Sequence, residues 1–183
     1  AILERDLSQL GFMGDFTGTP GNITVSSTAV TNDCIGAGLN NASFPNAQPT
    51  GFRYLWGYEQ GVSPQSLACI SPNSKTDVIQ IKRLIGPPAT FLTATRYYVA
   101  STLKAIVFFD GNAAAPGLAN SRNWEYQHHV YFIRDDGDIP VLRRRTLSIN
   151  NGMNNEEQLV EGIENMRVLY GVDNNADGTA DSY

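Results

Sequence analysis

Residues 125–147 read EYQHHVYFIRDDGDIPVLRRRTL, and they determine the architecture expected for the chain. Two runs with many apolar residues, 125–134 and 139–147, flank the segment Asp-Asp-Gly-Asp at 135–138. Asp-Gly supplies the positive φ that a tight hairpin turn needs. In the first run Tyr126, His128, Val130 and Phe132 fall at alternate positions, which places them on one face of a strand. The stretch therefore predicts an antiparallel hairpin with one face in a core.

The rest of the chain adds further strands and the end of one helix. Leu3, Leu7 and Leu10 form one stripe of a helix, which Gly11 would end. Residues 17–49 are rich in Gly, Asn, Thr, Ser and Pro and predict a long loop region. We expect an α+β fold in which the helix end, within residues 1–14, packs on an antiparallel sheet of one globular unit, residues 15–183. Further strands are expected at 23–25, 52–58, 77–85, 103–109 and 166–172.

Composition restricts the class of protein. The 183 residues carry 13 Lys and Arg against 18 Asp and Glu, a net charge of −5, which disfavours general binding to nucleic acid. The one basic run, Arg143-Arg144-Arg145, lies on an expected strand, where alternation sends Arg144 to the opposite face from its neighbours. No apolar run reaches the roughly 18 residues that a membrane span needs.

The sequence shows no recognisable catalytic constellation. His128 and His129 are adjacent on a strand and cannot bind one metal together. We expect one of them to be half-buried and the other to lie on the surface. Glu156-Glu157 and Asp135-Asp136 are expected in exposed turns or at helix starts, as solvated charges. Alternating aromatic residues are interpreted as the core face of a sheet rather than as a sugar-binding platform, and these are Phe52, Tyr54, Trp56 and Tyr58. The expectation is a protein that is not an enzyme.

The candidate metal site lies near the C-terminus, where side-chain oxygens recur at alternate positions. Such spacing is how a loop wraps a Ca²⁺ ion, with Gly178 allowing a sharp turn. The expected ligands are Asp173, Asn175, Asp177, the carbonyl of Thr179 and Asp181. The alternative is a simple turn, since Asp, Asn and Gly are the residues that turns select.

Four blocks of the sequence resemble the PilW family of type IV pilus minor pilins. Residues 159–178 resemble that family's C-terminal phrase and the Asp/Gly-rich turn that follows it. Residues 2–14 resemble its segment where the pilin helix gives way to the head, and residues 75–79 and 124–146 resemble a strand start and a Tyr-rich hairpin. The resemblance implies a pilin-like head, with residues 1–10 as the end of a long, truncated anchoring helix and with strands that continue after residue 183.

The resemblance also implies a function and a location. A minor pilin would bind other minor pilins and the pilus assembly complex, prime assembly and sit at the pilus tip. It would support adhesion and motility. Before assembly it would sit in the inner membrane through the missing helix, with its head in the periplasm. The alternatives are a J-type pseudopilin of type II secretion and, in another class, a secreted calcium-stabilised enzyme or carbohydrate-binding module.

Export would also decide the state of the two cysteines. Cys34 and Cys69 lie in loop-like surroundings and lack the C-x-x-C spacing of a zinc or redox site. In a periplasmic protein two such cysteines pair, whereas in a cytosolic protein they are usually unrelated thiols. We expect a disulfide between Cys34 and Cys69 that fastens the loop region to the sheet.

Overall fold

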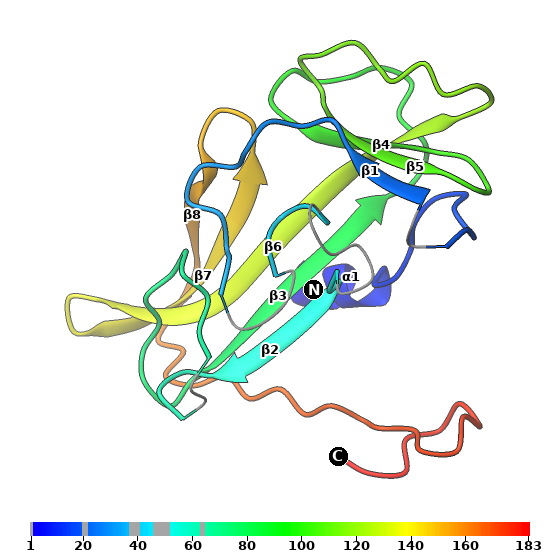
Figure 1. Cartoon of the computed structure of the whole chain (residues 1–183). Coiled ribbons are helices and arrows are strands. Elements are labelled where there is room, and N and C mark those ends of the chain that lie inside the picture. Colours follow the sequence, from blue (N-terminus) through cyan, green and yellow to red (C-terminus); the bar gives the residue numbers. More distant parts are fainter. Residues whose placement is uncertain (1, 20–21, 37–40, 46–51, 63–64) are drawn as a thin grey trace.

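The computed structural model describes residues 2–19, 22–36, 41–45, 52–62 and 65–183. Ala1 of the expected helix, and residues 20–21, 37–40 and 46–49 of the expected loop region, lie outside the described residues. Within these described residues, one helix and eight strands follow one another (Figure 1): α1 (Ile2–Ser8), β1 (Ile23–Val25), β2 (Leu55–Glu59), β3 (Asp77–Ile85), β4 (Tyr97–Ser101), β5 (Ile106–Asp110), β6 (Arg122–Asp136), β7 (Ile139–Ser148) and β8 (Gly152–Glu161).

The expected α+β fold with a long N-terminal helix is wrong, because the described chain is mostly β. Its helix α1 is seven residues long, and Gly11 (φ 75°) and Gly14 (φ 64°) then turn the chain in conformations that cannot continue a helix. The sheet is also mixed rather than antiparallel, since β1 runs parallel to β5. No helix within the described ranges is long and apolar enough to cross a membrane.

The sheet is curled, and β6 is its central strand. The strand order is β1-β5-β4-β6-β3-β2, with β7 pairing β6 and β8. β6 has fifteen residues, so one of its sides accommodates two neighbours in succession. β4 pairs with its first part, from Arg122 to Tyr126, and β7 pairs with its second part, from His129 to Asp136. β3 runs along the other side of β6.

The β6–β7 hairpin confirms the prediction made from residues 125–147. Asp136 pairs with Ile139, which leaves a two-residue turn with Gly137 at φ 62°. Glycine in the first position of such a turn is typical of a type II′ hairpin. β8 then pairs antiparallel with β7 and extends the sheet to an edge.

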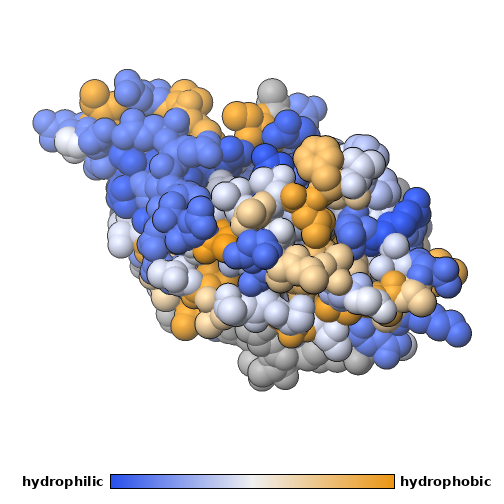
Figure 2. All heavy atoms as spheres, turned by 90° about the horizontal axis from the view of Figure 1, so that it is seen from above, coloured by the Kyte–Doolittle hydropathy of each residue, from blue (hydrophilic) through white to orange (hydrophobic). Residues whose placement is uncertain are grey.

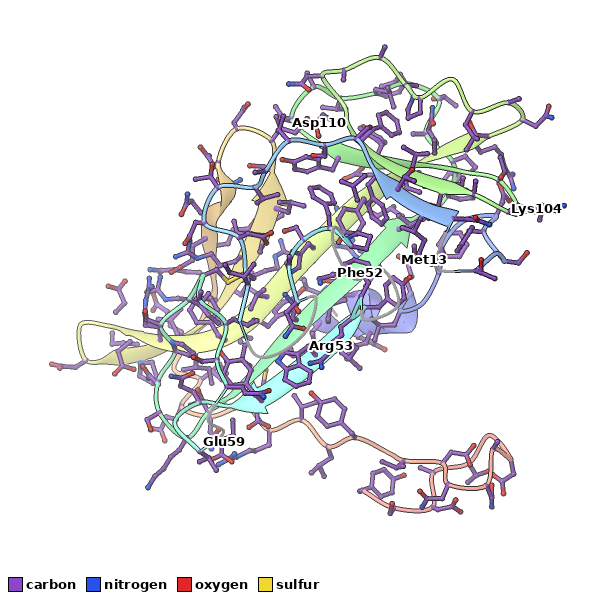
Figure 3. The ribbon with its side chains drawn as sticks, in the orientation of Figure 1. Met13, Phe52, Arg53, Glu59, Lys104 and Asp110 are labelled. Atoms are coloured by element: carbon purple, nitrogen blue, oxygen red, sulfur yellow. A yellow bond between two sulfur atoms is a disulfide. The ribbon has the colours of Figure 1, made fainter. Side chains whose placement is uncertain are left out.

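The two faces of the sheet bury different clusters. The larger core lies inside the curl and contains Phe52, Phe108, Tyr126 and Phe132. Tyr58 belongs to it and Trp56 packs against it, so the interpretation of residues 52–58 as a core face is confirmed (Phe52 is labelled in Figure 3). On the opposite face, buried side chains of β3 and β6 are covered by α1 and by the segment after β8. That cluster comprises Ile79, Ile81 and Tyr131, with Leu3, Leu10, Leu55, Leu159, Met166 and Val168 packed on it.

Several predicted boundaries differ from the structure. Residues 77–85 and 23–25 are strands as expected, whereas 52–58 and 103–109 shorten or shift to β2 and β5. Residues 166–172 form no strand, although Val172 makes an isolated bridge with Ser182. β4 and β8 were not anticipated. The surface seen in Figure 2 mixes hydrophobic and hydrophilic residues.

Candidate functional site

A buried ionic cluster fixes α1 to the sheet. Asp6 is fully buried, and its Oδ1 accepts bonds from Nε (3.0 Å) and Nη2 (2.9 Å) of Arg83 on β3. Its Oδ2 accepts the Tyr131 hydroxyl at 2.6 Å and also meets Nδ1 of His129. Gln9 accepts a further bond from Arg83. One helix residue is therefore held by two strands through four hydrogen bonds.

The partners of Asp6 keep its carboxylate charged. Burial by itself disfavours the ionised form, but the hydrogen bonds from His129 and Tyr131 and the positive charge of Arg83 outweigh burial. The pKa of Asp6 is consequently well below its ordinary value. Burial, with Asp6 as a neighbour, raises the pKa of Tyr131 to about 12. The cluster thus carries a permanent buried anion that only its partners make tolerable.

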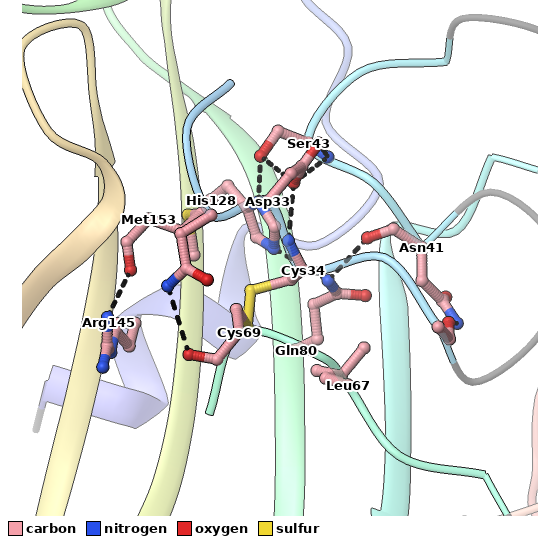
Figure 4. Close-up of a disulfide and its surroundings, with 12 residues drawn as sticks. Asp33, Cys34, Asn41, Ser43, Leu67, Cys69, Gln80, His128, Arg145 and Met153 are labelled. Carbon is pink, nitrogen blue, oxygen red and sulfur yellow. Dashed lines mark hydrogen bonds between the residues drawn. A yellow bond between two sulfur atoms is a disulfide. The ribbon is translucent and has the colours of Figure 1, made fainter. Parts of the chain in front are cut away.

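A second buried polar chain lies on the opposite face of β6, beside the disulfide (Figure 4). Gln80 Nε2 lies 2.8 Å from Nε2 of His128 and can only donate, so Nε2 of the imidazole accepts. Nδ1 therefore carries the proton and donates to Ser43 Oγ at 2.9 Å. The Ser43 hydroxyl then donates to Asp33 at 2.8 Å. Burial holds the pKa of His128 well below its usual value, in agreement with a neutral ring.

This arrangement contains Ser, His and Asp but is not a catalytic triad. In a triad the histidine accepts the serine proton and donates to the carboxylate. Here Ser43 lies between the other two side chains, and its proton goes to Asp33. Ser43 and His128 are both fully buried. The chain of bonds therefore holds the loop at 41–45 against β3 and β6.

Lys82 lies on the same face without an ion-pair partner among the described residues. Its Nζ donates to the Ala42 carbonyl at 2.5 Å and lies 4.3 Å from the centre of the Phe52 ring. Burial lowers the pKa of Lys82 to about 7, and the charge of Asp33 offsets only part of that effect.

Cys34 and Cys69 form the expected disulfide. It joins the loop after β1 to the loop between β2 and β3, so it connects two loops rather than a loop and a strand. The chain-entropy relation gives about 3–4 kcal/mol for closing a loop of 35 residues. Its surroundings add backbone bonds, such as Ala68 N to the Ile35 carbonyl at 2.8 Å.

Charged pairs line the β7–β8 ladder. Arg143 and Arg145 both bond Glu156 (2.9 and 2.8 Å), and on the other face Arg144 bonds Glu157 (2.8 Å). The predicted alternation of the three arginines is confirmed, and they do not form one basic stripe. The expectation that Glu156-Glu157 lie in a turn or helix start is wrong, because both lie within β8. The expected exposure of the histidines is also wrong, since His128 and His129 are both buried.

After β8 the chain forms what we call the C-terminal arm, residues 162–183. Its base is fastened to β2 and β3: Arg167 Nη1 lies 2.9 Å from Glu59 and 3.1 Å from Asp77, and Val168 N donates to Asp77 at 2.7 Å. Figure 3 labels Glu59 at this end of β2. A Cβ on Gly57 would lie 1.7 Å from the Tyr170 hydroxyl, so any side chain at residue 57 would displace the Tyr170 ring from this position.

The predicted calcium loop lies at the far end of the arm, which extends away from the sheet (Figure 1). Asp173 accepts bonds from the backbone N–H groups of residues 175–178, which lower its pKa, that of Gly178 most. Asn175 accepts from Asp177 N, Asp177 from Thr179 N, and Asp181 from Asn174 N. No group of three or more potential metal-binding side chains occurs in the described part of the chain. The geometry is that of an Asx-rich turn, and calcium binding stays a prediction.

The sequence did not reveal the cluster around Asp6. A signal was present, because Leu3, Asp6 and Leu10 share one helical face at spacings of three and four. Leu7, which the sequence placed on one stripe with Leu3 and Leu10, is 37% exposed. An acidic residue on the helix face that packs against the sheet is expected to have buried hydrogen-bonding or ionic partners, because acids are rarely buried unpaired.

Comparison with protein families matches residues 130–183 to the family described as Type IV Pilus-assembly protein W, PilW. The matched part comprises the end of β6 from Val130 onward, then β7, β8 and the arm. It contains the block at 159–178 on which the resemblance rested, whereas the blocks at 2–14 and 75–79 lie outside it. No curated protein and no solved structure matches the chain.

Proposed function

We propose that this chain, whose residues 130–183 match the PilW family model, is a minor pilin that contacts other pilus subunits. The family assignment supports a role in type IV pilus assembly and a periplasmic or cell-surface location. The observation that carries the finer proposal is that the matched part ends in the exposed C-terminal arm.

The arm has the character of a binding element. Its base is anchored by Arg167, whereas Leu169 and Tyr183 are 79% and 85% exposed. Apolar side chains held outward on an anchored segment lose little further entropy when a partner covers them. The charges of Asp173, Asp177 and Asp181 favour a partner surface that is basic around an apolar patch.

The cluster around Asp6 supports the same proposal from the other end of the chain. A buried carboxylate with partners on two strands holds α1 in one orientation relative to the sheet. Subunits that must stack in register need such fixed geometry. We propose that the domain primes assembly and lies at the pilus tip, presenting the arm to neighbouring minor pilins.

Gene deletion with complementation tests the role. Loss of the gene should reduce surface pili and twitching motility, and the wild-type gene should restore both. Complementation with Leu169→Asp should restore neither, because a charge would be buried at the contact. Leu103→Asp is the matched control, since Leu103 is 65% exposed on the turn between β4 and β5.

Three outcomes would overturn the proposal. One is normal piliation in the deletion strain. Another is full complementation by Leu169→Asp at wild-type protein levels, which would remove the arm from the contact. Co-purification with the pseudopilins of a secretion system instead of minor pilins would show that the protein belongs to the secretion system.

A further inference from the structure

The sheet splits where β6 changes neighbours. β4 ends its pairing at Tyr97 opposite Tyr126, and β7 ends its pairing at Thr146 opposite His129. A crevice of about 380 Å³ lies at this split, lined by residues of β4, β6, β7, β8 and the turn between β7 and β8. Concave sites that carry a few polar side chains are where proteins usually bind small ligands.

The lining of the crevice combines aromatic and aliphatic side chains with amides and hydroxyls, several of which bond one another. Gln127, Thr146 and Asn155 lie on one face of the sheet. His129 of β6 pairs with Thr146 of β7, which pairs with Asn155 of β8, and Gln127 lies two residues before His129 on the same face of β6. Asn151 donates to Asn155 (2.7 Å), and Asn155 donates to Ser148 (2.7 Å). Thr146 Oγ1 has no hydrogen-bond partner among the residues that the structure describes.

The charges in the crevice cancel. Arg96 Nη1 lies 2.8 Å from Glu125, and Gln127 also donates to Glu125 at 3.2 Å. Arg96 and Glu125 are the charged residues of the crevice lining. The lining of this crevice therefore has no net charge with which to attract an anionic ligand such as a phosphate. An apolar ligand would leave amides and hydroxyls without partners, which is costly.

A second hollow of about 230 Å³ continues from the same ion pair. It shares Arg96 and Glu125 with the crevice and is walled by Pro87, Pro88 and Phe91. The Phe91 side chain is 78% exposed. The two hollows together place an exposed aromatic ring beside a strip of planar donors and acceptors.

From this arrangement we propose that the crevice binds a neutral oligosaccharide. Sugar hydroxyls both donate and accept, so they match Asn, Gln and the Arg96–Glu125 pair, and the C–H face of a pyranose packs on a ring such as Phe91. A peptide strand fits less well, because Ile149 N bonds the Thr95 carbonyl (3.1 Å) and thereby ties the ends of β7 and β4 together. The proposal is independent of the role in pilus assembly.

The test uses a printed array of neutral and acidic oligosaccharides, followed by calorimetric titration of the best neutral ligand. We expect binding to at least one neutral oligosaccharide. Phe91→Ala, which removes the ring, and Asn151→Ala, which removes an amide of the strip, should each raise Kd about tenfold or more. Leu103→Ala and Asn112→Ala are matched controls at exposed positions outside both hollows and should leave Kd within about twofold.

Each other result overturns the proposal. If no neutral oligosaccharide on the array binds, the proposal is refuted. A preference for acidic sugars contradicts the balanced charge of the crevice lining. Binding that both Phe91→Ala and Asn151→Ala leave unchanged places the sugar elsewhere on the molecule. Thermal unfolding of each variant ensures that a lost affinity does not come from a lost fold.

Discussion

Replacing Asp6 with Asn should destabilise the protein far more than its place on a short helix suggests. The side chain keeps its size but loses its charge, so Arg83 stays buried without a counterion from α1. Arg83, His129 and Tyr131 all donate to the two oxygens of the carboxylate. The amide has one oxygen and can accept only some of these hydrogen bonds. Its own NH₂ group would face these donors.

The expected loss follows from the burial of both ions. Arg83 and Asp6 have side-chain exposures of 3% and 0%, so solvent screens neither. Removing one partner of a buried pair costs about 3–5 kcal/mol. A domain is stable by only about 5–15 kcal/mol, so Asp6→Asn should remove a large fraction of the free energy of unfolding. Adding Arg83→Met should recover part of the loss, because it removes the stranded cation.

The effect should depend on pH with a definite sign. The pKa of Asp6 is lower in the folded protein than its ordinary value of 3.8. The stabilisation from Asp6 is therefore fully present above about pH 5 and declines as the pH falls below about 4, where the unfolded chain takes up the proton first. The difference between wild type and Asp6→Asn should be constant from pH 5 to 7 and shrink toward pH 3.

Urea denaturation followed by tryptophan fluorescence measures the loss of unfolding free energy and, when repeated at several pH values, its pH dependence. Asp138→Asn provides the matched control, because Asp138 is exposed in the β6–β7 turn and should change stability by less than about 0.5 kcal/mol. A loss below about 1 kcal/mol for Asp6→Asn, or a loss that grows as the pH falls, would refute the description of Asp6 as a buried, ionised anchor.

Two further predictions concern Lys82 and the arm. Because burial lowers the pKa of Lys82 from 10.5 to about 7, Lys82→Met should stabilise the fold by about 2–4 kcal/mol at pH 6. This gain should fall between pH 7 and 10.5, where wild-type stability rises; equal gains in urea melts at pH 6 and pH 9 would contradict it. If the loop at residues 173–181 binds Ca²⁺, the ion should slow hydrogen exchange of its amides in wild type but not in Asp177→Ala. Exchange that neither calcium nor chelator changes would leave only a turn.

Local signals in the sequence identified part of the sheet. Residues 77–85 were predicted as a strand with the observed bounds, and the hairpin turn at Gly137 was found, because each depends on neighbours in the chain. β4 was missed because Tyr97–Ser101 is a short apolar run, buried along its whole length, with no alternation to detect. β8 was missed because its Asn and Glu residues have little intrinsic preference for strands, and its pairing with the arginines of β7 overrides that preference.

In the candidate site, too, local features could be predicted from the sequence and long-range contacts could not. The Cys34–Cys69 pair could be expected, since it needed only the even count and an exported class. The partners of Asp6 could not, because Arg83 and His129 are 77 and 123 residues away along the chain. Both histidines were expected to be more exposed than they are, because their burial depends on Ser43 and Asp6, which only the fold brings near.

The long separation between Asp6 and its partners has a consequence for biosynthesis. The chain is made from its N-terminus, so α1 exists before any of the residues that hold it. Arg83 is made 77 residues later, and His129 and Tyr131 are made 123 and 125 residues later. Contacts that span so much sequence form late, because a long loop must close before they can contribute. During synthesis α1 therefore cannot complete its contacts with the head until β6 has been made and has paired with β3.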